Sequence, residues 1–281
     1  QELNDRVVAA TLIGTLQTAY TNFHYLRDVW RRTTEKDALL GVGMTGIGSG
    51  RIQRLDLESA SKLAVETNKY YAAEIGVKQS ARITTVKPSG TTSCVLGTSS
   101  GVHAWHNDYY IRRVRVGKNE AIYTYLTIHH PELVEDDFFK PESQAVISIP
   151  QRAPNDGILR HETSLELLER VKDIYNRWIV PGHRTGNNTH NVSCTVSVRD
   201  EEWEEVGKWM WQNREYYNGI AVLPYFGGNY KQAPFEDIDE KTFEGMFIKL
   251  KEVDLSNVVE VIDNTNLTGE LACAGASCEI T

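Results

Sequence analysis

Cysteine is scarce in this sequence, which has four in 281 residues. Four cysteines in a chain of this length do not form a disulfide framework, so a secreted, disulfide-stapled protein is excluded. A reducing, cytoplasmic location is expected instead. Half of the supply, Cys273 and Cys278, nevertheless lies at the very end of the chain.

Long hydrophobic runs are also missing. The longest apolar stretches, such as "VVAATLIG" and "GIAVLPYF", are too short to cross a bilayer, so no membrane partner is expected. The sequence opens with "QELNDR", which has neither an initiator Met nor the basic and apolar regions of a signal peptide. We interpret this start as an internal cut in a longer protein.

Positive charge is in deficit, with 30 Lys and Arg against 38 Asp and Glu and a net charge of −8. This balance argues against a nucleic-acid partner, which would need a broad basic face. Only "YYIRRVRVGK" is locally basic. An alternating strand with outward-facing arginines is favoured there, while a nucleic-acid patch and a contact with an anionic ligand stay open.

Periodicity predicts helices alternating with strands. Helical spacing of apolar residues runs from Val8 and Leu12 to Trp30, and Asp56 and Gly76 bound a second helix. Thr163 and Glu166 form a capping-box signature. The expected helices cover 2–31, 56–75, 164–180, 200–216 and 238–251, with a short one before Pro131, and the expected strands cover 81–86, 109–116, 145–150, 191–198 and 219–226.

This alternation predicts an α/β fold rich in parallel strands. Five strands suffice for an open sheet or for part of a barrel, and periodicity does not choose between them. The last thirty or so residues lack a clear period and are expected to be a flexible tail.

The stretch "GVGMTGIG" contains the spacing Gly41-x-Gly43-x-x-Gly46, which invites a dinucleotide-binding interpretation. Such a motif should follow a strand and open a helix, but this one follows a predicted helix. Glycines that let two backbone segments approach closely are therefore the favoured interpretation.

A better candidate site is "KPSGTTSCVLGTSSG", from Lys87 to Gly101. It follows the predicted strand 81–86, and ligands of α/β folds gather at the carboxyl ends of strands. Pro88 and Gly90 predict a turn, and the hydroxyls and backbone N–H groups around it suit an anion. An ordinary Ser/Thr-rich loop is the alternative.

Other polar groups carry weaker signals. His103 and His106 flank Trp105, but no further ligand at a familiar spacing completes a metal site, so no metal is expected. The stretch 181–194 is polar enough to line a pocket or to be a surface loop. Cys194 alternates with valines along a strand and is interpreted as a buried small residue.

The tail cysteines, Cys273 and Cys278, are separated by "AGAS", a spacer flexible enough to let them form a disulfide. Zinc would need two more ligands that the neighbourhood does not offer. A mobile thiol pair that exchanges disulfides with a partner is the favoured interpretation over two incidental cysteines.

Several of these stretches together resemble one family, the adenosylcobalamin-dependent (class II) ribonucleotide reductases of the monomeric ribonucleoside-triphosphate type. The resemblance is carried by the glycine motif, the terminal Cys-x4-Cys, "HRTGNNTHNVSCTVSV" and "VKPSGTTSCVLGTSSGVHAWHNDYYIRRVRV". It runs along the whole chain, in the order of the family's C-terminal portion.

The resemblance implies a fold, namely the C-terminal half of a ten-stranded α/β barrel. Residues 1–255 would form that part of the barrel, and residues 256–281 the flexible tail with the redox cysteines. The partners implied are an N-terminal half of the reductase, a ribonucleotide substrate and thioredoxin or a similar dithiol donor.

The resemblance also implies roles for particular residues. The substrate phosphates would bind at Ser89, Gly90, Thr91, Thr92 and Ser93. The adenosylcobalamin cofactor would be contacted by Ser99, Ser100, Gly101 and His103.

In this family a cysteine thiyl radical removes the ribose 3′ hydrogen, the 2′ hydroxyl leaves, and two cysteines become a disulfide. The product deoxyribonucleotides serve DNA replication. Cys273 and Cys278 would carry reducing equivalents into the closed barrel, which a bulky external reductant cannot enter.

The sequence departs from the family in one respect. The radical cysteine normally lies in an Asn-x-Cys-x-Glu context, which this chain lacks. We therefore expect no turnover by the chain alone. Two alternatives stay open: a nucleotide- or cobalamin-binding fragment without turnover, and an unrelated phosphate-binding α/β enzyme.

Overall fold

The computed structural model describes residues 1–225 and 230–260. They divide into two compact units, and each is described by itself. Unit 1 comprises residues 1–104 and 161–225, and unit 2 takes residues 105–160 and those that follow 225. The predicted tail, 256–281, lies outside the described residues except for its first five positions.

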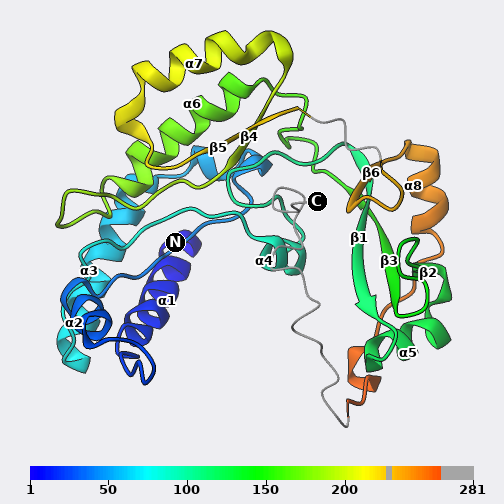
Figure 1. The fold of residues 1–281 in the computed structure, drawn as a ribbon, viewed down its shortest axis with the longest axis horizontal. Coiled ribbons are helices and arrows are strands. Elements are labelled where there is room, and N and C mark those ends of the chain that lie inside the picture. The colour runs from blue at the N-terminus through cyan, green and yellow to red at the C-terminus, as the bar shows by residue number, and fades with distance from the viewer. Residues whose placement is uncertain (226–229, 261–281) are drawn as a thin grey trace. The chain divides into compact units, whose positions relative to one another are not determined.

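A parallel array of extended segments runs through unit 1 (Figure 1). Strand β4 (Thr195–Val198) pairs in parallel with β5 (Ala221–Pro224). Two further segments join on the other side through single parallel bridges, from Val86 to Val192 and from Val42 to Thr84. The order across the array is therefore 40–42, 82–86, 191–198 and 221–224.

Helices connect the consecutive members of this array. They are α3 (Leu57–Ile75), α6 (Ser164–Ile174) and α7 (Trp203–Gln212). A helical crossover is what a parallel pair requires, since its ends lie at opposite edges of the sheet. The α/β class predicted from the sequence is confirmed for unit 1.

The predicted helix boundaries hold where a cap defines them. The Asp56 carboxylate accepts a hydrogen bond from the Ser59 amide at 3.0 Å, and Gly76 ends α3 in the left-handed conformation. Thr163 and Glu166 form the predicted capping box at the start of α6. Local side-chain chemistry therefore fixes these ends.

A π-helical turn, Tyr175–Ile179, follows α6 directly. The Trp178 carbonyl lies in the last turn, where no helical amide reaches it, and it accepts the hydroxyls of Ser61, at 2.8 Å, and Thr84. The Trp178 indole N–H donates to the Thr85 carbonyl at 3.1 Å. One turn thus joins α3, the central segment 82–86 and α6.

The main core of unit 1 lies between the array and these helices. Its fully buried members are aliphatic residues from the extended segments and the inner faces of the helices. They include Ile83, Val86, Val192, Val196, Leu57, Leu168, Val171 and Ile174.

The predicted helix over 2–31 is wrong in extent. Helix α1 ends at Gln17, and α2 begins again at Asp28 and runs to Asp37. Threonines and Asn22 between them are poor helix formers whose side chains compete for backbone groups. The Thr18 hydroxyl, for example, donates to the Thr15 carbonyl.

The predicted buried face of α1 is wrong as well. Val7, Thr11 and Thr15 are buried, whereas Leu16 is 47% exposed. The hydroxyls of Thr11 and Thr15 donate to carbonyls one turn earlier, and Asn68 of α3 donates to Thr15 at 3.0 Å. Hydrogen-bonded threonine hydroxyls therefore occupy the interface between α1 and α3, where the apolar spacing had predicted leucines.

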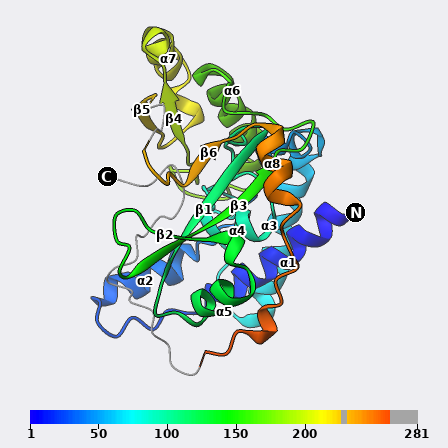
Figure 2. The ribbon, with the colours of Figure 1, turned by 90° about the vertical axis from the view of Figure 1, so that its right-hand side faces the viewer.

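Unit 2 is an antiparallel sheet with strand order β2-β3-β1-β6. Figure 2 shows its long strands with α5 and α8 nearby. The element bounds are β1 Tyr109–Gly117, α5 Ala121–His129, β2 Val134–Asp136, β3 Gln144–Arg152, β6 Phe235–Asp237 and α8 Glu240–Phe247.

The antiparallel pairing corrects the prediction that all five strands belong to one parallel half barrel. The strands predicted at 109–116 and 145–150 are β1 and β3, which pair antiparallel over nine residues. Strand β3 starts at the end of the sheet where β1 stops, so the connection through α5 is not the crossover that a parallel pair would need. Among the described residues the strands form a four-stranded and a two-stranded sheet, and a ten-stranded barrel is not seen there.

Two of the three arginines of the locally basic strand β1 are paired with acids, and the third, Arg112, lies over the Phe235 ring. Arg113 contacts Glu135 at 3.3 Å and Glu236 at 2.6 Å, and Arg115 contacts Asp137 at 2.8 Å. Their charge is thus neutralised within the sheet. The prediction that the arginines face outward is wrong, because Arg112 is buried and the Arg113 side chain is only 9% exposed, whereas Val114 is exposed.

The π-turn generates a stability prediction. Replacing Trp178 by Phe removes buried volume and leaves the Thr85 carbonyl without its donor, which should cost about 2–4 kcal/mol of unfolding free energy. Urea unfolding followed by circular dichroism measures this. The same change at Trp211, which is 72% exposed, should cost under about 0.5 kcal/mol. Equal losses at both positions would contradict the anchoring role of Trp178.

Candidate functional site

The hydroxyl-rich stretch predicted to bind phosphate forms a loop and a short helix in unit 1. It continues the central segment 82–86, and its middle is α4 (Gly90–Val95; Figure 1). Ser89 is the N-cap residue, but its side chain does not cap the helix. The loop therefore lies where α/β folds bind ligands, at the carboxyl end of a parallel segment.

Hydrogen-bond donors at the start of α4 are left for a ligand. Thr91 and Thr92 are exposed, and no other described residue hydrogen-bonds to their hydroxyls. The backbone N–H groups of residues 90–92 likewise find no acceptor within the described chain. Anions bind where such donors converge.

Two of the predicted phosphate-binding serines are engaged within the loop itself. The Ser93 hydroxyl donates to the Ser89 carbonyl, and Ser93 is buried. The Ser89 amide donates to the Ser100 hydroxyl at 2.8 Å. These contacts tie the start of α4 to the far end of the loop.

The glycine segment 41–50 packs directly against this loop. The amide of Gly46 donates to the Ser99 carbonyl at 2.9 Å, and that of Ile47 to the Gly101 carbonyl at 3.1 Å. A Cβ at Gly48 would overlap the His103 carbonyl oxygen, and one at Gly46 the Thr98 hydroxyl. The predicted close backbone approach is therefore seen at Gly46, while Gly43 has room for a side chain and Gly48, outside the predicted motif, is the tightest position of the segment.

Thr45, within the same glycine segment, makes three contacts with the loop through one hydroxyl. Its Oγ1 lies 2.6 Å from the Ser89 hydroxyl and 3.0 Å from the Ser99 carbonyl, and it accepts the Gly101 amide at 2.9 Å. Sequence reasoning missed this residue. The available signal was a threonine between the apolar residues and glycines of the stretch 41–48.

His103 is held between two backbone groups. Its Nε2 accepts the Thr195 amide at 3.2 Å, so the ring proton lies on Nδ1, which contacts the Ser100 carbonyl at 3.1 Å. Burial lowers the pKa of His103 below its usual value and favours this neutral form. Both ring nitrogens are therefore used within unit 1.

The chain just before His103 is anchored by Arg170 of α6. The Arg170 guanidinium donates to the Val102 carbonyl at 3.0 Å and forms two hydrogen bonds of 2.6 Å with Glu162. Arg170 and Glu162 are both largely buried. A paired, hydrogen-bonded charge is the form in which a buried arginine is tolerated.

Cys194 lies in the same interior and is inert. It is buried, and desolvation raises the pKa of its thiol to about 12. This confirms the prediction of a buried small residue. Cys94, in α4, is exposed, and its thiol donates to the Gly90 carbonyl at 3.0 Å.

The polar stretch 181–194 is a loop whose side chains bind neighbouring backbone. Asn191 donates to the Gly219 carbonyl at 2.6 Å, and the Asn218 amide group donates to the carbonyls of Thr189 and His190. These contacts stabilise the turn before β4. The Asn191 side chain and the carbonyls of Thr189 and His190, which the sequence suggested for a pocket or a surface loop, are thus engaged within unit 1.

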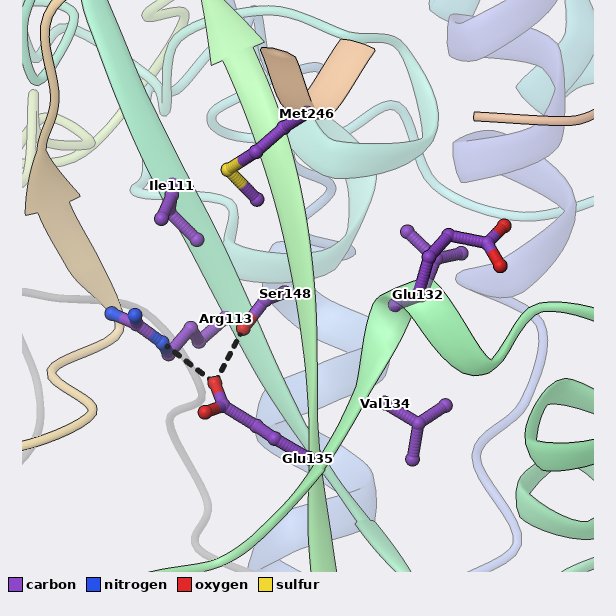
Figure 3. A pocket seen from close by; sticks show the side chains of 8 residues that line it. Ile111, Arg113, Glu132, Val134, Glu135, Ser148 and Met246 are labelled. Atoms are coloured by element: carbon purple, nitrogen blue, oxygen red, sulfur yellow. Dashed lines mark hydrogen bonds and ion pairs between the residues drawn. The ribbon is translucent and has the colours of Figure 1, made fainter. Parts of the chain in front are cut away.

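A cavity of about 260 Å³ lies on the sheet of unit 2 (Figure 3). Its charged wall is self-paired, because Glu135 contacts Arg113 and accepts the Ser148 hydroxyl at 2.7 Å. Ile111 and Met246 line the apolar side. We assign it no ligand.

Other classes of site find no support in the described chain. No group of three or more His, Cys, Asp or Glu side chains that could hold a metal occurs among residues 1–225 and 230–260. None of the helices in these ranges is long and apolar enough to cross a membrane. The predicted redox residues Cys273 and Cys278 lie outside the described residues.

Curated relatives of this chain are ribonucleotide reductases. It is 26% identical to the adenosylcobalamin-dependent ribonucleoside-triphosphate reductase of Lactobacillus acidophilus over 97% of this chain and 40% of that protein. It is 28% identical to the reductase of the same description from Lactobacillus leichmannii, over 78% of this chain and 29% of that protein. The chain thus spans less than half the length of these relatives. No family model matches it.

A solved structure agrees with the sequence relatives. A B12-dependent (class II) ribonucleotide reductase matches 90% of this chain and 39% of its own length, with a TM-score of 0.72 and 21% identity. The resemblance predicted from the sequence is therefore confirmed by similar proteins and by the fold. Which end of those proteins the chain corresponds to stays a prediction.

The glycine contacts generate a second prediction. Gly48→Ala should displace the loop, because its Cβ would overlap backbone that cannot rotate away. We expect a lower unfolding temperature, which circular dichroism measures. Gly43→Ala is the matched control, because its Cβ would meet only the Thr85 carbonyl at 3.8 Å. Comparable behaviour of the two variants would contradict the close-approach role.

Proposed function

We propose that this chain forms part of an adenosylcobalamin-dependent ribonucleotide reductase that converts ribonucleotides, as triphosphates, to 2′-deoxyribonucleotides in the cytoplasm. The observation that carries the proposal is the hydroxyl-rich loop at the end of the central parallel segment, in a fold that matches a class II reductase. Relatives named as reductases align with 77–97% of this chain.

Within that enzyme, this chain binds the substrate by its phosphates. Gly90, Thr91 and Thr92 present backbone N–H groups and two hydroxyls to the phosphate oxygens, while Ser89 and Ser93 hold the turn in shape. Binding of the phosphates fixes the ribose relative to the reacting groups. This orientation lowers the entropic part of the activation barrier.

Adenosylcobalamin would supply the homolytic cobalt–carbon cleavage that starts the radical chemistry. Of the residues predicted to contact it, Ser100, Gly101 and His103 hydrogen-bond to polar groups of Ser89, Thr45 and Thr195, respectively. Ser99 is buried, and its hydroxyl has no hydrogen-bond partner among the described residues. Contact between these four residues and the cofactor stays a prediction, and no step is derived through them.

The two electrons for reduction come from thiols. When the 2′ hydroxyl leaves as water, a cysteine pair beside the ribose is oxidised to a disulfide, and this pair is not formed by Cys94 and Cys194. Cys273 and Cys278 then reduce that disulfide by exchange and become oxidised themselves. Thioredoxin or a similar dithiol donor resets them.

The alternatives are less well supported. A binding fragment without turnover is not favoured, because the relatives reported above are named as reductases. An unrelated phosphate-binding enzyme does not account for alignment and fold agreeing on one family. The rest of the reductase, including a radical cysteine, would be contributed by sequence beyond this chain.

The phosphate loop is tested in the complete reductase. Gly90→Val should place a branched side chain where phosphate oxygens approach backbone N–H groups, raising the substrate KM roughly tenfold or more. Steady-state assays with one ribonucleoside triphosphate measure this. Gly207→Val in α7, where a Cβ meets nothing within 4 Å, is the control. An unchanged KM in Gly90→Val would remove the loop from the substrate site.

The tail is tested by its choice of reductant. Cys273→Ser or Cys278→Ser should abolish turnover driven by thioredoxin but spare turnover driven by a small dithiol, which reaches the internal disulfide directly. Ser277→Ala serves as the neighbouring control and should behave as the unmodified enzyme with both reductants. Full thioredoxin-driven activity in either cysteine variant would show that the pair is not the shuttle.

A further inference from the structure

We propose that Thr45 is a positioning residue for the phosphate loop, which it holds closed through a single hydroxyl. The inference rests on the proposed function, because it assigns a role within the same loop. Thr45 itself is half-buried in the glycine segment and belongs to neither of the groups predicted to touch a ligand.

The direction of each hydrogen bond follows from the chemistry of the three partners. A threonine hydroxyl has one proton to donate and two lone pairs to accept with. The Ser99 carbonyl, 3.0 Å away, can only accept, so it takes the Thr45 proton. The Gly101 amide, at 2.9 Å, can only donate.

The contact with Ser89 is then also determined. At 2.6 Å either hydroxyl could donate in principle, but the Thr45 proton is already committed to Ser99. Ser89 must therefore donate to Thr45, which fills the second lone pair. All three hydrogen-bonding positions of Thr45 are occupied, with one bond given and two received.

This geometry holds the two ends of the loop together. Ser89 stands at the start of α4, and Ser99 and Gly101 stand at the far end of the loop. The Ser89 amide adds a direct link to Ser100 at 2.8 Å. Without the Thr45 hydroxyl, Ser89 would keep this one hydrogen bond to the far end of the loop among the described residues.

The same geometry limits which groups can serve the ligand. Phosphate oxygens accept hydrogen bonds, so they need donors. The Ser89 hydroxyl proton goes to Thr45 and its amide proton to Ser100, so neither is free for phosphate. Residues 90–92 are then the donors to phosphate, and Ser89 supports the shape of the loop without donating to the phosphate itself.

The test uses equilibrium binding of a ribonucleoside triphosphate to the complete reductase, beside binding of the unphosphorylated nucleoside. Thr45→Val keeps the side-chain shape and removes the hydroxyl. We expect the triphosphate Kd to rise roughly tenfold and the nucleoside Kd to stay unchanged. Thr45→Ser should restore the triphosphate Kd to within about twofold.

A matched control separates positioning from general loss of stability. Thr98→Val removes a hydroxyl of the same loop, one that contacts Ser49 of the glycine segment at 3.1 Å but touches neither Ser89 nor Gly101. It should leave the triphosphate Kd near that of the unmodified enzyme. Equal weakening by Thr98→Val and Thr45→Val would overturn the specific role of Thr45.

A double-mutant cycle tests whether Ser89 supports the loop only through its hydrogen bond to Thr45. If its hydroxyl acts only through Thr45, Ser89→Ala should weaken triphosphate binding alone but add little in the Thr45→Val background. Full additivity would mean that Ser89 donates to the phosphate directly, and the inference would fail.

Thr91→Val and Thr92→Val distinguish this failure from that of the proposed function. If they weaken triphosphate binding while Thr45→Val does not, the loop binds phosphate and the positioning role is wrong. If none of the variants at residues 45, 91 and 92 changes the triphosphate Kd, the phosphate site itself is wrong.

Discussion

The close backbone approach between the glycine segment 41–50 and the loop that follows residue 86 is the constraint on which the candidate site depends. Two backbone hydrogen bonds, from Gly46 to Ser99 and from Ile47 to Gly101, require the chains to meet without side chains between them. Gly46 adopts a positive φ of 79° and Gly48 faces a carbonyl. Glycine meets both demands, because it lacks a Cβ and adopts positive φ without strain.

Two buried side chains, Arg170 and His103, also hold the loop, and each is itself hydrogen-bonded to other parts of unit 1. Arg170 fixes the Val102 carbonyl while paired with Glu162, and His103 bridges Ser100 and Thr195. Each anchor is a buried polar group whose partners are backbone or a countercharge, and these partners offset part of the cost of its burial. A preformed loop loses less conformational entropy when it binds a ligand, because its shape is set before the ligand arrives.

Sequence patterns predicted this structure where local chemistry decides the outcome. Asp56, Gly76 and the Thr163 box mark helix ends because one side chain or one φ angle determines each of them. The same patterns failed for α1, whose buried face depends on hydroxyls matched to Asn68 far along the chain. They also failed for the pairing of β1 with β3, because parallel and antiparallel strands share one period and differ only in where the connection runs.

The chain order explains why the candidate site could be located from sequence but not built from it. Residues 87–101 are contiguous, so their hydroxyl-bearing residues and glycines predict a loop from local sequence alone. The residues that shape it come from four other segments, around residues 45, 103, 170 and 195, and no local pattern joins them. Immediately after this loop, at residue 104, the chain leaves unit 1, and it returns only at residue 161. Val102 and His103 stand just before that departure, and both are fixed, one to α6 and one to β4. The hydrogen bonds from Thr45, Arg170 and His103 that hold the loop in shape therefore join residues of unit 1.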